Sequence, residues 1–210
     1  MRIVFSGSAA NPPTCAHLEI GEIMTQCGLF DRAIWLPSGE RADKPHIAAA
    51  EHRLHMTELL FSPEWRASRP IPFEIDTRDI GRQNTPTILL WRELRERFPD
   101  AELTFAVGAD VLMPSERFGG KCEIAHHWIE GETLLREANF LVIPRRGYPD
   151  PDTLTLPIRY ISAKKFPASA ASSTDVRERI TRGLPFEHLV TPEVAAYIKE
   201  NNLYQTHKQG

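Results

Sequence analysis

The chain alternates short apolar runs with helical patterns from one end to the other, and this alternation restricts its fold more than any other feature. The runs are nearly continuous in Val, Ile, Phe and Ala, as expected of parallel strands that are covered on both faces. The alternation predicts an α/β fold, an open doubly wound parallel sheet in a single domain of residues 1–210. We expect strands at Ile3–Ser6, Ala33–Leu36, Phe73–Ile75, Leu103–Val107, Phe140–Ile143 and Arg159–Ile161.

Helical patterns lie between these strands, and several have recognisable ends. Gly28 suits the stop of the first helix, because glycine readily adopts the left-handed conformation that follows many helices. Thr85 is predicted to cap the third helix, with Pro86 at its first position. Segment 113–127 is the least regular, and we expect a loop or an irregular insertion there. The expected helices cover about 14–27, 48–61 and 86–98, about 172–183, and a last segment that begins at Thr191.

Composition narrows the class of protein. A net charge of −3 over 210 residues gives no general surface for nucleic acid or membrane. The N-terminus begins directly with a strand pattern and has no signal-peptide features, and no apolar run approaches the ~20 residues of a membrane helix. The cysteines Cys15, Cys27 and Cys122 are scattered and odd in number, which favours a reducing compartment. We therefore expect a cytoplasmic protein.

The junction between the first strand and the first helix has the character of a phosphate site. The small residues Ser6, Gly7 and Ser8 allow a phosphate to approach backbone amides, and the following helix directs its positive end at that place. Thr14 and His17 are one helical turn apart, so both can face the same anion. The junction has neither the dinucleotide-binding glycine pattern nor a P-loop. A structural histidine beside a tight turn is the alternative interpretation.

A second helix N-terminus near the end of the chain has similar chemistry. Ser172, Ser173 and Thr174 supply hydroxyls and amides at the start of the predicted helix. Arg177 lies one turn inside and carries a planar donor fork suited to phosphate. An ordinary capped surface helix is the alternative. Together the two junctions predict two anion sites on one α/β sheet.

These two segments resemble the motifs of the nicotinate-nucleotide adenylyltransferases, Gly-Gly-x-Phe-Asp-Pro-Pro-His-x-Gly-His and Ile-Ser-Ser-Thr-x-x-Arg. Other segments are similar in the same order, among them Arg53–Met56, Val107–Asp110 and Ala138–Tyr148, so the resemblance covers nearly the whole chain. It implies a Rossmann-like nucleotidyltransferase fold. It also implies transfer of AMP from ATP to nicotinate mononucleotide, assisted by Mg²⁺, by direct attack on the α-phosphate, which gives deamido-NAD and pyrophosphate.

The resemblance also implies roles for individual residues. His17, Arg177 and Thr14 would be catalytic, and no protein ligand to a metal is implied. The nicotinate mononucleotide would be bound by Thr85, Thr87 and Trp128, with the indole stacked on the pyridine ring. ATP would be bound by Ser6, Gly7, Ser8, His17, Lys44, Asp110, Ser172, Ser173, Thr174 and Arg177.

The chain departs from the family pattern in three respects. Thr14 replaces the first histidine of the first motif, and threonine donates one hydrogen bond but carries no charge. The turn before it keeps small residues but loses the family's acid, and the link at 113–127 is longer than usual. Nicotinamide mononucleotide or dual specificity, another nucleotidyltransferase of the superfamily, and a non-catalytic ATP- or NAD-binding module are the alternatives. Homo-oligomer formation is left open.

Overall fold

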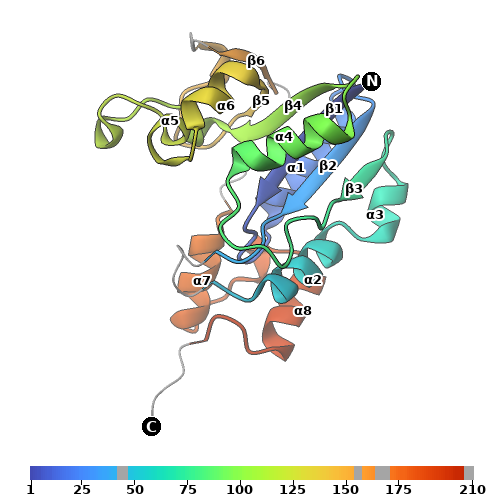
Figure 1. Cartoon of the computed structure of the whole chain (residues 1–210). Helices are drawn as coiled ribbons and strands as arrows, with labels where there is room; N and C mark the ends of the chain where they lie inside the picture. Colours follow the sequence, from blue (N-terminus) through green and yellow to red (C-terminus); the bar gives the residue numbers. More distant parts are fainter. Residues whose placement is uncertain (42–46, 154–157, 164–170, 206–210) are drawn as a thin grey trace.

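The computed structural model describes residues 1–41, 47–153, 158–163 and 171–205 and contains a six-stranded parallel sheet (Figure 1). The strand order is β3-β2-β1-β4-β5-β6, so the order reverses between β1 and β4 at the centre of the sheet. Ligands of open α/β sheets bind outside the carboxyl ends of the strands at such a reversal. Each of the six predicted strands is confirmed, as β1 (Arg2–Ser8), β2 (Arg32–Pro37), β3 (Phe73–Ile75), β4 (Glu102–Gly108), β5 (Asn139–Ile143) and β6 (Arg159–Ser162).

The central strand β1 shows why the strands in the middle of the sheet contain nearly continuous apolar runs. Val4 pairs in register with Ala33 of β2 and with Thr104 of β4. Side chains alternate between the two faces of a strand, so Val4 enters one hydrophobic cluster while Ile3 and Phe5 enter the other. Both faces are therefore buried, which explains the continuous apolar runs.

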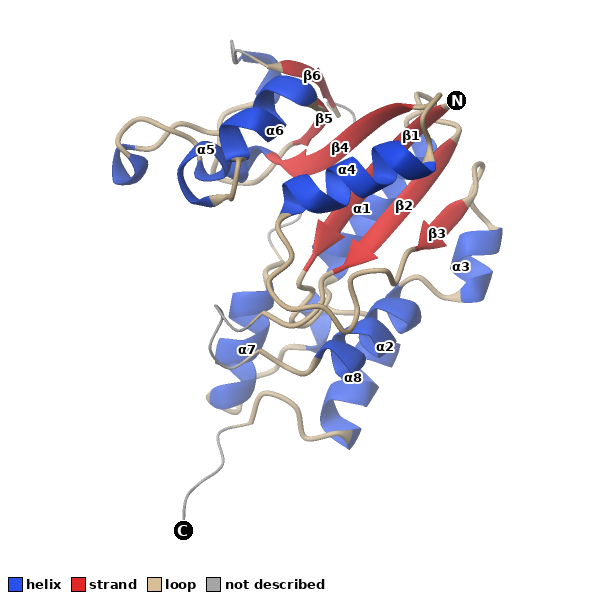
Figure 2. Ribbon diagram, viewed as in Figure 1, coloured by secondary structure: helices blue, strands red, loops and turns tan. Residues whose placement is uncertain are grey.

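Helices cover both faces of this sheet, as Figure 2 shows with α4 in front of the strands and α1 behind them. The cluster on one face is completed by α1, α2, α7 and α8, and the cluster on the other face by α4, α5 and α6. The short helices α3 and α6 were not expected from the sequence. The helix bounds are α1 Cys15–Gln26, α2 Ala50–Leu60, α3 Pro63–Ala67, α4 Thr87–Arg97, α5 Glu123–His127, α6 Gly131–Glu137, α7 Ser173–Thr181 and α8 Pro192–Glu200.

Most of the predicted helix ends are confirmed, but one is wrong. Gly28 follows α1 with a φ of 73°, and the hydroxyl of Thr191 accepts from the backbone N–H of Val194 at the start of α8. Thr85 does not cap α4, because the helix begins at Thr87 and Pro86 takes the capping position with an extended ψ of 139°. Thr85 is therefore one residue too early to reach the free amides of the first turn.

Segment 113–127 is more regular than the sequence predicts. It contains a 3₁₀ turn at Glu116–Phe118 and then helix α5, whose Ile124 is fully buried. The prediction of irregular structure is therefore wrong for the second half of this segment. Among the described residues, no helix has the length and apolar character required to cross a membrane.

Candidate active site

The turn between β1 and α1 lies at the carboxyl edge of the sheet, beside the reversal of strand order. Ser6 is buried, and its hydroxyl donates to the carbonyl of Ala106 over 3.0 Å, which ties β1 to β4. Gly7 is exposed, and a Cβ there would lie 3.0 Å from the carbonyl oxygen of Leu36. Ser6 therefore links β1 to β4 just before the turn, while Gly7 leaves its backbone exposed to solvent.

His17 is held by hydrogen bonds on both ring nitrogens. The backbone N–H of Thr14 donates to Nδ1 over 3.0 Å, so Nδ1 must be an acceptor. In a neutral imidazole the proton then resides on Nε2, which lies 3.0 Å from the hydroxyl oxygen of Ser8. We assign the Nε2–H tautomer on this geometry. His17 thus presents a neutral N–H donor at the carboxyl edge of β1.

The environment of His17 keeps its ring neutral. Burial lowers the pKa of His17 from 6.5 to about 4, and the positive charge of Arg145 acts in the same direction. Thr14 has no exposed surface, and its hydroxyl lies 2.9 Å from Nδ1. Thr14 is thus packed behind the imidazole, whereas the sequence suggested that both side chains can face one anion.

The N-terminus of α7 is fastened to the same turn, although it is far away in sequence. The hydroxyl of Ser173 donates to the carbonyl of Pro12 over 2.7 Å. Arg177 donates from Nη1 to the carbonyl of Asn11 over 2.6 Å, and from Nη2 to the hydroxyl of Thr174 over 3.2 Å. These bonds hold the N-terminus of α7 against the turn that precedes α1. The sequence predicted two anion sites on one sheet and did not predict this contact.

Hydroxyls also organise the first turn of α7 itself. The side chain of Ser172 accepts from the backbone N–H of Asp175 over 3.1 Å, which confirms the predicted cap. Thr174 is exposed beside it. Nη1 and Nη2 of Arg177 each donate one hydrogen bond within the protein. A guanidinium has five N–H groups, so the other three can donate to a phosphate.

Asp110 and Arg145 form a pair at the ends of the neighbouring strands β4 and β5. Arg145 Nε lies 3.4 Å from Asp110 Oδ2, and both side chains are partly exposed. Gly108 permits this arrangement, because a Cβ there would lie 2.3 Å from Asp110 Oδ1. Asp110 was singled out from the sequence but Arg145 was not. Arg145 could have been noticed in the sequence because it lies two residues after the buried strand β5.

The residues singled out for the mononucleotide lie on the other face of the sheet. Thr85 and Thr87 flank the start of α4, and Trp128 directly follows α5, with all three side chains partly exposed. The indole of Trp128 packs near Phe105, with 6.1 Å between ring centroids. Ile88 in the first turn of α4 and the indole of Trp128 both belong to the hydrophobic cluster on this face of the sheet.

Two of the sequence predictions concern cations. Lys44 lies outside the described residues. Within the described ranges, no group of three or more His, Cys, Asp or Glu side chains gathers as a metal site. The rings of His126 and His127 contact each other and Phe118 in T-shaped or tilted arrangements, with ring centroids 4.4–5.2 Å apart.

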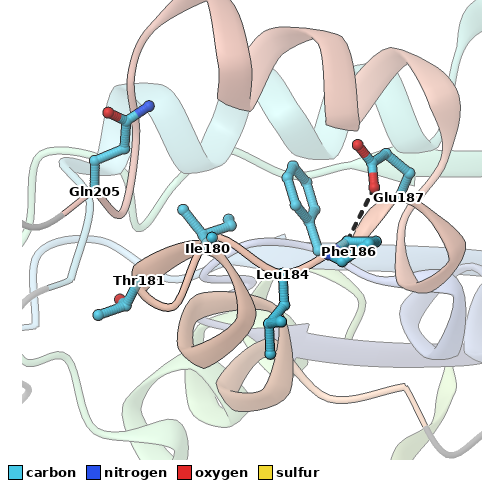
Figure 3. Close-up of a pocket in the computed structure, with 8 residues that line it drawn as sticks. Ile180, Thr181, Leu184, Phe186, Glu187 and Gln205 are labelled. Atoms are coloured by element: carbon cyan, nitrogen blue, oxygen red, sulfur yellow. Dashed lines mark hydrogen bonds between the residues drawn. The ribbon is translucent and has the colours of Figure 1, made fainter.

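A surface pocket lies at the opposite end of α7 from this site (Figure 3). In this pocket Glu187 accepts a hydrogen bond from the backbone N–H of Phe186 over 2.9 Å. The lining residues include no lysine or arginine, so the pocket lacks a cation that could face a phosphate. They are Ile180, Thr181, Gly183, Leu184, Pro185, Phe186, Glu187 and Gln205.

Comparison with known proteins agrees with this geometry. The Cytidylyltransferase-like family matches residues 5–179, which include both helix N-termini of the site. A protein of Leifsonia xyli subsp. xyli named "Probable nicotinate-nucleotide adenylyltransferase" is 33% identical over 207 residues, covering 98% of this chain and 94% of the relative. The chain belongs to the nicotinate-nucleotide adenylyltransferase family. A relative of the same name from Clavibacter michiganensis subsp. michiganensis is 31% identical and covers 98% of this chain.

Solved structures support the fold of this nicotinate-nucleotide adenylyltransferase family member. The Plasmodium falciparum nicotinic acid mononucleotide adenylyltransferase complexed with NaAD matches with a TM-score of 0.80. The match covers 97% of each chain at 22% sequence identity. Both the predicted Rossmann-like nucleotidyltransferase fold and the predicted family are therefore confirmed.

Proposed function

We propose that the chain is a nicotinate-nucleotide adenylyltransferase, which joins nicotinate mononucleotide to the AMP part of ATP. A phosphate oxygen of the mononucleotide attacks the α-phosphorus of ATP in line. The bond from this phosphorus to the oxygen that bridges to the β-phosphate breaks, and pyrophosphate leaves with the electron pair. The products are deamido-NAD and pyrophosphate. In such a transfer the protein positions the reactants and stabilises charge.

The observation that carries this proposal is the fixed Nε2–H of His17 beside the N-terminus of α7. Nε2–H would move from Ser8 to an oxygen of the α-phosphate, where negative charge increases in the transition state. A preorganised donor of this kind typically contributes a factor of about 10²–10³ in rate. In the free protein burial lowers the pKa of His17 to about 4, so a neutral hydrogen-bond donor is in place before ATP binds.

Arg177 and the first turn of α7 would hold the β- and γ-phosphates. The free amides of Ser173 and Thr174 favour an anion at this helix end. Arg145 adds a second positive charge on the side of His17. The positive charges of the two guanidinium groups would stabilise pyrophosphate as it departs.

The adenosine ribose would be bound by a side chain of the protein, and the metal would be bound mainly by ATP itself. Asp110 would accept hydrogen bonds from the ribose hydroxyls, since its carboxylate is partly exposed at the end of β4. ATP would arrive as its Mg²⁺ complex, which neutralises part of the phosphate charge, because Mg²⁺ binds substrate phosphates and water more readily than protein cages. Ser6, Gly7 and Ser8 would shape the turn that receives the α-phosphate.

Recognition of the pyridine would rest on Trp128 and the start of α4. The half-buried indole offers a face for stacking on the electron-poor ring. Thr87 is the first residue of an eleven-residue helix, Thr87–Arg97, and Thr85 lies two residues before it. The positive end of this helix favours a carboxylate over a neutral amide. This chemistry favours nicotinate over nicotinamide.

Pyrophosphate release from purified protein, ATP and Mg²⁺ tests the proposal. We expect pyrophosphate release with nicotinate mononucleotide. Release should be much slower with nicotinamide mononucleotide and absent without an acceptor. The His17→Ala variant should lose activity by about 10²–10³-fold. ATP binding without release with either acceptor would instead indicate a non-catalytic binding module.

A further inference from the structure

Arg53 is a fully buried arginine of α2 that donates to four backbone carbonyls and, over 3.4 Å, to the hydroxyl of Ser38. Nε donates to Ala48 over 2.8 Å, and Nη1 donates to Ala9 over 2.9 Å and to Ser38 over 2.8 Å. Nη2 donates to Gly39. Burial lowers the pKa of Arg53 from its ordinary value. No carboxylate among the described residues is hydrogen-bonded to this guanidinium. Burying a cation in this way is costly, so the arrangement points to a specific use.

The four carbonyls belong to three separate segments of the chain. Ala9 is in the turn between β1 and α1, directly after the Ser8 that contacts His17. Ser38 and Gly39 follow β2, and Ala48 precedes α2. One guanidinium group therefore connects the phosphate turn to the segment after β2.

The segment after β2 is in turn bonded to the segment that leads to Thr85. The backbone N–H of Glu40 donates to the carbonyl of Arg82, and that of Asn84 donates to the carbonyl of Glu40, each over 2.8 Å. Asp79 accepts from the backbone N–H of Gly39 over 2.8 Å. These bonds extend the connection from Arg53 to the residue before Thr85.

Gly39 shows how closely these segments approach one another. A Cβ at this position would lie 2.2 Å from the carbonyl oxygen of Asp79 and 2.4 Å from that of Arg82. Both neighbours are backbone atoms, so they cannot move aside as a flexible side chain would. The contact between the segment after β2 and the segment before α4 therefore requires glycine.

We propose that Arg53 is a positioning residue that sets the distance between the phosphate turn and the mononucleotide segment, 82–87. The inference rests on the proposed function, in which ATP contacts the first segment and the mononucleotide contacts the second. The planar fork of arginine can bond several carbonyls in fixed directions, whereas the single ammonium of lysine cannot. Loss of the fork would leave each segment able to bind its own substrate but would misalign the two.

The first test compares Arg53→Lys with Met56→Ala by steady-state kinetics. Met56 is also fully buried and lies one turn further along α2, but its side chain packs in the hydrophobic core. Arg53→Lys should lower kcat by about 10²-fold, the effect of a misplacement near 1 Å, with little change in either KM. Met56→Ala should lower the melting temperature without a comparable loss of kcat. Equal losses of kcat at equal loss of stability would overturn the proposal.

Binding of the dinucleotide product gives a second readout, because deamido-NAD must contact both segments at once. Arg53→Lys should weaken this product by a larger factor than it weakens ATP or nicotinate mononucleotide alone. Equal factors for all three would contradict a positioning role. Gly39→Ala serves as a second variant if Arg53→Lys does not fold. It keeps the guanidinium but disturbs the other contact of the same connection, between the segment after β2 and the segment before α4. It should therefore show the same selective loss.

Amide hydrogen exchange of the free protein separates this inference from the proposed function. Arg53→Lys should accelerate exchange in both 7–11 and 38–40, while Met56→Ala should not accelerate these segments selectively. This result would support the connection even if wild-type protein released no pyrophosphate, in which case the proposed function alone would fail. Unchanged exchange in both segments would overturn the connection while leaving the proposed function intact.

Discussion

The hydroxyl oxygen of Thr14 lies 2.9 Å from Nδ1 of His17, and the backbone N–H of Thr14 donates to the same nitrogen over 3.0 Å. This pair fixes the proton of the neutral ring on Nε2, the nitrogen that faces the proposed α-phosphate position. Thr14 occupies the place of a histidine in the family motif, but it is fully buried. We therefore expect it to act through His17 and not by direct contact with the phosphate.

Removal of the Thr14 hydroxyl should have a small effect compared with removal of the imidazole. Thr14→Val keeps the shape and the backbone N–H, so only one hydrogen bond of about 1 kcal/mol is lost. We expect kcat to fall about fivefold, and Thr14→Ser should restore most of it. Steady-state kinetics with saturating ATP measures kcat for each variant. A loss as large as that of His17→Ala would show that Thr14 contacts the reacting groups.

The low pKa of His17 predicts how stability depends on pH. Folded His17 stays neutral down to about pH 4, whereas unfolded His17 gains a proton below about pH 6.5. The unfolded state therefore binds more protons between these values, and the free energy of unfolding falls as the pH falls. At about 1.4 kcal/mol per pH unit, the free energy of unfolding should fall by roughly 3 kcal/mol between pH 6.5 and pH 4 because of His17.

Urea unfolding of wild type and His17→Gln at pH 7 and pH 4 isolates this contribution. The wild type should lose more stability than the variant over this range, by up to roughly 3 kcal/mol. Equal losses in the two proteins would mean that His17 titrates normally in the folded state.

Arg177 should contribute to ATP binding through its planar fork. Arg177→Lys removes the geometry that reaches both Asn11 and Thr174, and charged hydrogen bonds of this kind are worth about 1.5–3 kcal/mol. We expect kcat/KM for ATP to fall about 10- to 100-fold. Arg179→Lys is the matched control, because Arg179 pairs with Asp175 on the outer face of the same helix. Similar losses in both variants would rule out a specific role for Arg177.

Trp128 should affect the mononucleotide and not ATP. Aromatic stacking on a base is worth about 1–3 kcal/mol, so Trp128→Ala should raise KM for nicotinate mononucleotide by about tenfold or more. Trp128→Phe should retain much of the affinity. Trp65→Ala provides a control, since Trp65 packs near β3 against Phe61 and Phe73 on the opposite face. A parallel rise in KM for ATP would indicate a general disturbance of the fold.

The fold could be predicted from the sequence because its central strands β1, β2, β4 and β5 are buried on both faces, which gives continuous apolar runs. The exceptions are short elements that tertiary contacts create. Helix α6 begins at Gly131, a residue type that usually ends a helical pattern. A Cβ at Gly131 would collide with the carbonyl of Ile124, so glycine serves a close approach to α5. No local pattern contains that information.

The candidate site was predictable where its residues lie in one motif and not where folding brings them together. His17 and Arg177 each belong to a recognisable strand–helix or helix-start pattern. Arg145 was missed because it lowers the pKa of His17 only when the sheet is formed. The order β1-β4-β5 then brings the end of β5 close to the end of β1. Arg53 had one overlooked signal: it occupies the apolar stripe of α2 together with Met56, where a charge must find partners.

The bonds from Ser173 to Pro12 and from Arg177 to Asn11 span 161 and 166 positions of the chain. During synthesis the N-terminal part of a chain emerges first. All six strands thus leave the ribosome before the helix that completes the phosphate site. A nascent chain that has formed its sheet would still lack the helix end that binds the triphosphate. Nucleotide binding would therefore begin only after α7 has been synthesised.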